Sequence, residues 1–146
     1  MERIICLAIG YLFGMFQTSY IIGKIHHMDI RQYGSGNAGT TNALRTLGKK
    51  AGAMTLIGDM LKCVIAILIV DAVFKNRYQE ILPLLGMYTA AGCVLGHNFP
   101  FYLGFRGGKG IAASAGMLLA MDWRVFLICA VIFIGLVAIT RYVSLG

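Results

Sequence analysis

The sequence is poor in charge. Only 13% of its 146 residues are Asp, Glu, Lys or Arg, whereas 58% are hydrophobic and the mean hydropathy is +0.76. An ordinary soluble domain carries roughly twice that share of charge, about a quarter of its residues. Only a bilayer could cover so much apolar side chain, so the composition predicts an integral membrane protein. The length allows one membrane domain over residues 1–146.

Cysteine pairs and basic runs are also missing. The four cysteines stand singly in apolar segments, without a C-x-x-C pair, so neither a disulfide framework nor a metal site is predicted. The 13 Lys and Arg give a net charge of +7 but form no run, which argues against a nucleic-acid partner. Most of them lie between apolar segments, where they report membrane topology, while Lys62 lies within a span. No cofactor motif is present either, and we expect none to be bound.

Five apolar segments predict an all-α fold with five transmembrane helices. They cover residues 4–23, 51–74, 81–101, 110–121 and 125–140. The first has twenty residues, enough to cross a hydrocarbon core of about 30 Å, and we expect it to be one retained helix. The fourth would measure only about 18 Å, so it would have to tilt or lie where the bilayer is thin.

The positive charges predict the orientation of these helices. With the N-terminus outside, the inner loops hold Lys24, Arg31, Arg45, Lys49, Lys50, Arg106, Lys109 and Arg141, and the outer side holds Arg3, Lys75, Arg77 and Arg124. Eight cations against four favour this orientation, because cytoplasmic loops are enriched in Lys and Arg. The glycine-rich loops around residues 34–45 and 104–110 would then both face the cytoplasm.

These two loops share features with nucleotide-binding motifs without fulfilling either. GSGNAGTTNALR, residues 34–45, contains the G-x-G-x-x-G spacing, but the polar HHMDIRQY before it is no buried strand. GFRGGKG, residues 104–110, has Leu103 where a Walker A loop needs its first glycine and Gly110 where it needs a hydroxyl. Binding of a dinucleotide and hydrolysis of ATP are both disfavoured.

The same loops are suited to a simpler phosphate. Glycines let backbone N–H groups approach an oxyanion. Thr40 or Thr41 is expected to cap a short helix through TTNALRTLG, whose N-terminus favours anions. Arg45 and Lys109 add charge from separate loops. One such loop could serve only as a turn or for helix packing, but two cationic loops on one face predict a phosphate site.

The ordered motifs resemble the bacterial acyl-phosphate–glycerol-3-phosphate acyltransferase family. GSGNAGTTNALR is similar to its first motif, GHNFPFYLGFRGGKGIA (96–112) to its second, and RYVS (141–144) to the start of its third. GDMLK, residues 58–62, is similar to a pattern in its second span. Thr40 stands where the first motif usually has alanine. Members have seven spans, so the resemblance implies that this chain lacks the last two.

The resemblance implies transfer of a fatty acyl group from acyl phosphate to the sn-1 hydroxyl of glycerol 3-phosphate. The products are lysophosphatidic acid and phosphate, for phospholipid biosynthesis. The enzyme would be a multi-pass protein of the bacterial cytoplasmic membrane, with its site facing the cytoplasm and no obligate protein partner. The expected catalytic residues are Ser35, Arg45, Lys109 and His97; the expected substrate-binding residues are Gly34, Gly36, Asn37, Gly39, Thr41, Asn42, Gly107, Gly108, Gly110, Arg141 and Ser144.

Some roles stay open at the level of sequence. His97 could be a general base, or it could contact substrate or cap a helix end. Asp59 and Lys62, three residues apart in a span, could form a structural ion pair or contact substrate. Two other functions also remain, a small anion transporter or channel and a non-catalytic membrane subunit. The absence of an internal repeat makes transport the weaker reading.

Overall fold

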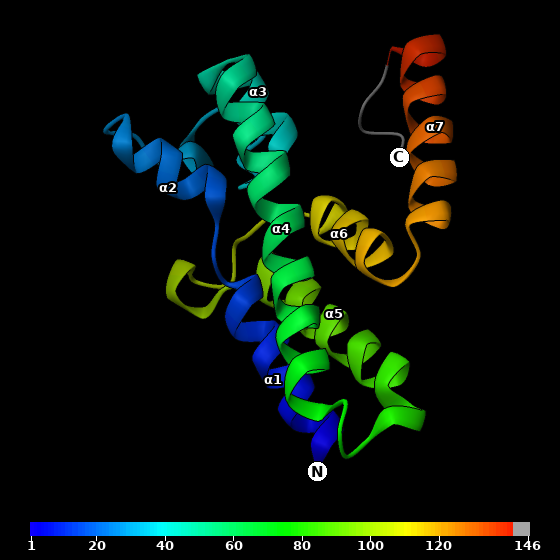
Figure 1. Cartoon of the computed structure of the whole chain (residues 1–146). Coiled ribbons are helices and arrows are strands. Elements are labelled where there is room, and N and C mark those ends of the chain that lie inside the picture. The colour runs from blue at the N-terminus through cyan, green and yellow to red at the C-terminus, as the bar shows by residue number, and fades with distance from the viewer. Residues whose placement is uncertain (142–146) are drawn as a thin grey trace.

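The computed structural model describes residues 1–141 (Figure 1). The α-helices are α1 (Glu2–Gly14), α2 (Thr18–Ile25), α3 (Thr40–Leu47), α4 (Lys49–Phe74), α5 (Leu82–Asn98), α6 (Ile111–Met121) and α7 (Trp123–Thr140). Short 3-10 turns, η1 (Ile30–Gln32), η2 (Gln79–Ile81) and η3 (Phe101–Leu103), lie in the connections. No strand occurs among residues 1–141, which confirms the all-α prediction.

Within residues 1–141, three segments are long and apolar enough to cross a membrane. They are Glu2–Ile25, Lys49–Phe74 and Trp123–Thr140, with mean hydropathies of 1.6, 2.2 and 2.4. At 17 and 11 residues, α5 and α6 are shorter. The membrane prediction agrees with these helices, while the total of five spans and their orientation stay predictions.

The prediction that the first span is one continuous helix is wrong, because the segment is divided into two helices. α1 ends at Gly14, α2 begins at Thr18, and Gln17 between them has extended backbone with φ −102° and ψ 95°. A break inside a membrane is tolerated when other groups satisfy the freed backbone. Here Lys62 Nζ donates to the Phe16 carbonyl at 2.6 Å. The break therefore depends on a polar side chain from α4.

Helices α1 and α5 pack backbone against backbone through glycines. Gly10 and Gly14 on α1, and Gly92 and Gly96 on α5, are each spaced as G-x-x-x-G. A Cβ at Gly92 would overlap the Leu7 carbonyl oxygen. Such small-residue pairs are a common contact between membrane helices, and this one was missed by our sequence reading. It fixes the end of α5 beside the break after α1.

The long helix α4 is the centre of the molecule (Figure 1). It contacts α1 and α5 along one half, α2 and α3 along the other, and α6 between them. α7 packs against α6, and none of the residues in its apolar window is buried. Because α4 touches every other part of the core, its buried polar residues reach the region where the loops converge.

Candidate active site

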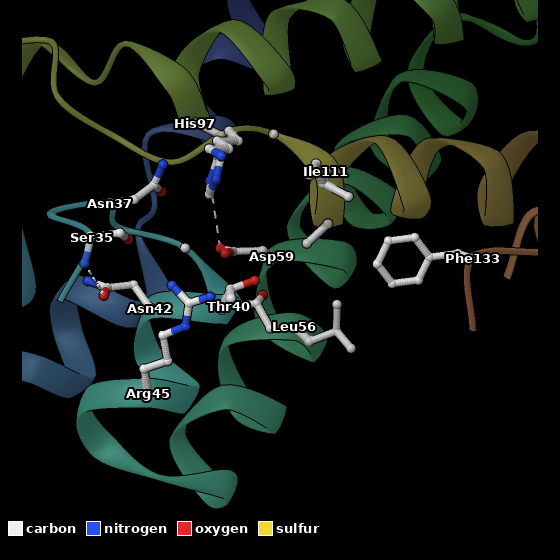
Figure 2. Close-up of a pocket in the computed structure, with 15 residues that line it drawn as sticks. Ser35, Asn37, Thr40, Asn42, Arg45, Leu56, Asp59, His97, Ile111 and Phe133 are labelled. Atoms are coloured by element: carbon white, nitrogen blue, oxygen red, sulfur yellow. Dashed lines mark hydrogen bonds and ion pairs between the residues drawn. The ribbon is translucent and has the colours of Figure 1, made fainter. Parts of the chain in front are cut away.

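A cavity of about 500 Å³ lies where both glycine-rich loops meet α4 (Figure 2). Its lining consists of Ser35, Asn37, Gly39, Thr40, Thr41, Asn42, Arg45, Leu56, Asp59, His97, Lys109, Gly110, Ile111, Ala112 and Phe133. These residues come from segments that are far apart in the chain. The structure therefore brings the two loops together, as the sequence predicted.

Most of the predicted site residues lie in this lining. Those that do are Ser35, Asn37, Gly39, Thr41, Asn42, Arg45, His97, Lys109 and Gly110. Gly34, Gly36, Gly107 and Gly108 belong to the same loops without lining the cavity. Arg141 is exposed at the end of α7 and does not line it, and Ser144 falls outside the described residues.

The first loop is built around the Asn42 side chain. Its Nδ2 donates to the carbonyls of Ile30 and Tyr33 at 3.0 and 3.1 Å, and its Oδ1 accepts from the Ser35 N–H at 2.9 Å. Gly34 has φ +59°, and a Cβ there would overlap Asn42 Oδ1. The amide of Asn42 is thus engaged at both ends. The structure assigns it to shaping the loop that presents Ser35.

The start of α3 differs from the predicted cap. Gly39 is the N-cap residue, with φ −133° and ψ 172°, and no side chain caps the helix. Neither Thr40 nor Thr41 caps, because both already lie inside the first turn. The Thr40 hydroxyl is buried and has no hydrogen-bond partner among the described residues, and both threonines line the cavity. The predicted cap is wrong, and the first turn of α3 instead faces the cavity.

An Arg31–Asp29 pair joins the two loops. Arg31 Nη2 lies 2.7 Å from Asp29 Oδ2, its Nε donates to Oδ1 at 3.0 Å, and its Nη1 donates to the Leu103 carbonyl at 2.8 Å. The guanidinium also lies 5.2 Å from the centre of the Tyr20 ring. Such a bidentate pair has a defined geometry. Our sequence analysis missed it, although the D-x-R spacing offered a clue.

Because of this ion pair, we predict that the thermal stability of the fold decreases at low pH. Hydrogen bonds from Arg31 lower the pKa of the Asp29 carboxyl below its ordinary value. The pair therefore stabilises the fold above the unfolded pKa, about 4, and this contribution is lost as pH falls through the lowered folded value. When the pH is lowered below about 4, we expect the melting temperature of the Asp29→Asn variant to fall less than that of the unaltered chain. Thermal unfolding in detergent across pH measures it, and equal acid sensitivity of the two proteins would contradict it.

The second loop folds back on the end of α5. The N–H groups of Gly107 and Gly108 donate to the carbonyls of Asn98 and His97, both at 3.0 Å. Ala38 N–H, from the first loop, donates to the Gly107 carbonyl at 3.3 Å. The amides of Gly107 and Gly108 are thus used inside the protein. They hold Lys109 and Gly110 at the cavity, which is a different role from the direct contact expected of them.

Two cations give the cavity its positive charge. Arg45 on α3 and Lys109 on the second loop both line it, and both are exposed. Neither forms an ion pair with any group in residues 1–141. Figure 2 shows Arg45 beside Ser35 and Asn42 on the polar side of the cavity. Unpaired cations next to hydroxyls and a helix N-terminus suit an anionic ligand.

Below the loops lies a buried ion pair. Lys62 Nζ is 2.9 Å from Asp59 Oδ1, with side chains 4% and 1% exposed, so the two residues do form an ion pair, and Asp59 also lines the cavity. Thr18 Oγ1 also donates to Asp59 Oδ1, at 3.1 Å. Lys62 Nζ further lies 2.8 Å from His97 Nδ1. The network connects α2, α4 and α5 directly beneath the cavity.

Comparison with known proteins agrees with this architecture. The family model described as "Glycerol-3-phosphate acyltransferase" matches residues 4–146. A glycerol-3-phosphate acyltransferase of Clostridioides difficile is 55% identical over 98% of this chain and 70% of its own length. One from Lactiplantibacillus plantarum is 46% identical over 100% of this chain and 68% of its own.

A solved structure has the same fold. The crystal structure of PlsY (YgiH), an integral membrane glycerol 3-phosphate acyltransferase in its glycerol 3-phosphate form, superposes with a TM-score of 0.83. It is 35% identical, and the match covers 99% of this chain and 70% of that one. The lysophosphatidic acid form gives a TM-score of 0.81. By sequence motif, family model and structure, this chain belongs to the membrane-integral glycerol-3-phosphate acyltransferase family.

Proposed function

We propose that this chain transfers a fatty acyl group from acyl phosphate to the sn-1 hydroxyl of glycerol 3-phosphate. The products would be lysophosphatidic acid and inorganic phosphate, in the pathway that makes phospholipids. The observation that carries this proposal is the cavity where Arg45 and Lys109, unpaired within residues 1–141, meet from different loops. Two cations at one cavity suit a reaction in which both substrates carry a phosphate.

The reaction needs little chemistry from the protein. Acyl phosphate is a mixed anhydride with a good leaving group, so placement of the two substrates and stabilisation of charge supply most of the catalysis. The alcohol oxygen forms a bond to the acyl carbon, the bond from that carbon to the phosphate oxygen breaks, and the released phosphate takes the hydroxyl proton. No acyl-enzyme is required, and the Oδ1 atom of Asp59, a carboxylate in the lining, is already held by Lys62.

We assign the proposed roles from the residues that line the cavity. Arg45 and Lys109 would neutralise phosphate charge, while Ser35, Asn37 and Thr41 would donate hydrogen bonds. Gly39 and Gly110 would present their backbone to a ligand, since both line the cavity. Gly34, Gly36, Gly107 and Gly108 would act through loop shape. The sequence motif adds Arg141, which does not line the cavity, and Ser144, which falls outside the described residues.

The side of the cavity opposite the polar loop residues is lined by apolar side chains. Leu56 of α4, Ile111 and Ala112 of α6, and Phe133 of α7 form that side, and Figure 2 shows the labelled ones opposite Ser35, Asn37 and Asn42. A fatty acyl phosphate has the same division, with a charged head and an apolar chain. The lining thus supports an amphipathic substrate over a small inorganic anion.

We also propose that the site faces the cytoplasm of a bacterial cell, with the N-terminus outside. The excess of Lys and Arg on the loops that form the cavity supports this orientation. A reporter enzyme fused at residue 76, between α4 and α5, tests it directly. Activity of a reporter that works only outside the cytoplasm would support the orientation.

The reaction is tested by incubating the purified full chain in lipid vesicles with palmitoyl phosphate and glycerol 3-phosphate. We expect lysophosphatidic acid and phosphate in equal amounts, and no product when palmitoyl-CoA replaces palmitoyl phosphate. Product from palmitoyl-CoA alone would contradict the proposed donor. Phosphate flux across the vesicles without product would instead support a transporter.

A further inference from the structure

The Lys62 ammonium group has no hydrogen-bonding capacity left over. Its Nζ lies 2.6 Å from the Phe16 carbonyl oxygen, 2.9 Å from Asp59 Oδ1 and 2.8 Å from His97 Nδ1. A protonated lysine has three N–H donors and no acceptor. Three partners therefore use all three donors of the ammonium group, which lies beside the Asp59 carboxylate.

This arrangement determines which nitrogen of His97 carries a proton. Since Lys62 can only donate, His97 Nδ1 must accept, and an N–H at Nδ1 would point at another N–H across 2.8 Å. An imidazolium would face the ammonium with the same clash and with like charge. The neutral ring must then hold its proton on Nε2, because neutral imidazole has one donor and one acceptor.

The Nε2 edge of His97 is the one left for a ligand. His97 is 2% exposed and lines the cavity, and no group in residues 1–141 makes a hydrogen bond to Nε2. Gly108 lies directly against this edge, where a Cβ would overlap Nε2. Any larger residue at this position would crowd the nitrogen. Figure 2 shows the His97 ring between the second loop and Asp59.

We propose that Lys62 is a positioning residue that holds His97 as a neutral Nε2–H donor, which donates to a substrate oxygen in the cavity. Through this donor His97 would stabilise negative charge as the acyl group moves. A general base needs a free lone pair, and the only lone pair of this ring is occupied by Lys62. The identity of the acceptor rests on the proposed function, whereas the proton position does not.

The proton position can be measured without disturbing the network. The chain has three histidines, so His26→Gln with His27→Asn leaves His97 alone; both are exposed, and His27 has φ +58°, which asparagine tolerates. With ¹⁵N-labelled histidine in vesicles at pH 7, we expect NMR to show a proton bonded to Nε2 and none on Nδ1. A proton on Nδ1, or on both nitrogens, would overturn the proposal. This result is independent of any activity.

The role of Lys62 needs a second spectrum. In a chain that also carries Lys62→Met and Asp59→Asn, which removes both charges together, Nδ1 loses its cationic partner. We expect the Nδ1–H tautomer to become populated, since no N–H group then points at Nδ1. An unchanged Nε2–H ring in this variant would show that Lys62 does not position the proton.

Activity measurements on two variants of His97 distinguish a hydrogen-bond donor from a general base. Glutamine can place an amide N–H where Nε2 lies, whereas the shorter asparagine cannot reach it. We expect His97→Gln to keep kcat within about tenfold, and His97→Asn to lose about 10²- to 10³-fold, the usual effect of removing one such donor. Equal, large losses in both variants would indicate a base and overturn the donor role. Absence of lysophosphatidate from the unaltered chain would count against the proposed function alone.

Discussion

Lys109→Ala is expected to lower kcat/KM for lysophosphatidic acid formation by about 10²- to 10³-fold, the range for loss of one group that stabilises developing charge. Lys109 reaches the cavity from the second loop and has no ion-pair partner in the described residues. Its charge is therefore available to a bound phosphate. Steady-state assays with palmitoyl phosphate in vesicles measure the loss.

The matched control is Lys50→Ala. Lys50 is exposed in the first turn of α4, does not line the cavity, and its removal changes the net charge by the same amount. We expect turnover within about twofold of the unaltered chain, because a remote exposed charge is screened by salt. Lys109→Arg should recover part of the activity. A similar loss in Lys50→Ala would mean that net charge, and not the position of Lys109, matters.

Gly92→Ala is expected to destabilise the protein by about 3 kcal/mol or more, the upper range for overpacking. The added methyl group would overlap the Leu7 carbonyl oxygen and approach the Tyr11 backbone nitrogen, so α1 and α5 would have to separate. Backbone atoms cannot rotate away as a side chain can. Thermal unfolding in detergent, followed by circular dichroism, measures the change.

Gly135→Ala provides the comparison. Gly135 is in α7, and a Cβ there meets nothing within 4 Å. Alanine favours a helix over glycine by about 1 kcal/mol, so we expect this variant to be as stable as the unaltered chain or slightly more stable. If Gly92→Ala also left stability unchanged, the close packing of α1 and α5 described here would be incorrect.

The features that the sequence revealed were those encoded by short, local patterns. Hydropathy indicated the membrane, and the glycine-rich loops that carry Arg45 and Lys109 indicated two of the segments that line the cavity. Their meeting at one cavity followed because loops on the same side of a membrane can converge. The ion pair between Asp59 and Lys62 could also be predicted from the sequence, since two opposite charges one helical turn apart in an apolar span favour pairing.

What the sequence did not reveal depends on contacts between distant segments. The break at Gln17 looks like continuous helix because it lies inside a mostly apolar segment of twenty residues, 4–23. The group that satisfies it, Lys62, lies 46 residues from Phe16. The role of Asn42 was hidden in the same way, since its partners are backbone carbonyls. A motif identifies a polar residue without saying whether it meets a ligand or its own loop.

The two-sided lining of the cavity affects how a lipid product would leave. Under the proposed reaction, the fatty chain stays beside Leu56, Ile111 and Phe133 while only the group at its end is exchanged. Carrying such a chain through water would cost about 0.8 kcal/mol for every methylene. A newly made lysolipid could instead slide sideways past α6 and α7 into the surrounding leaflet. Its release would then be sensitive to the thickness and fluidity of the host bilayer.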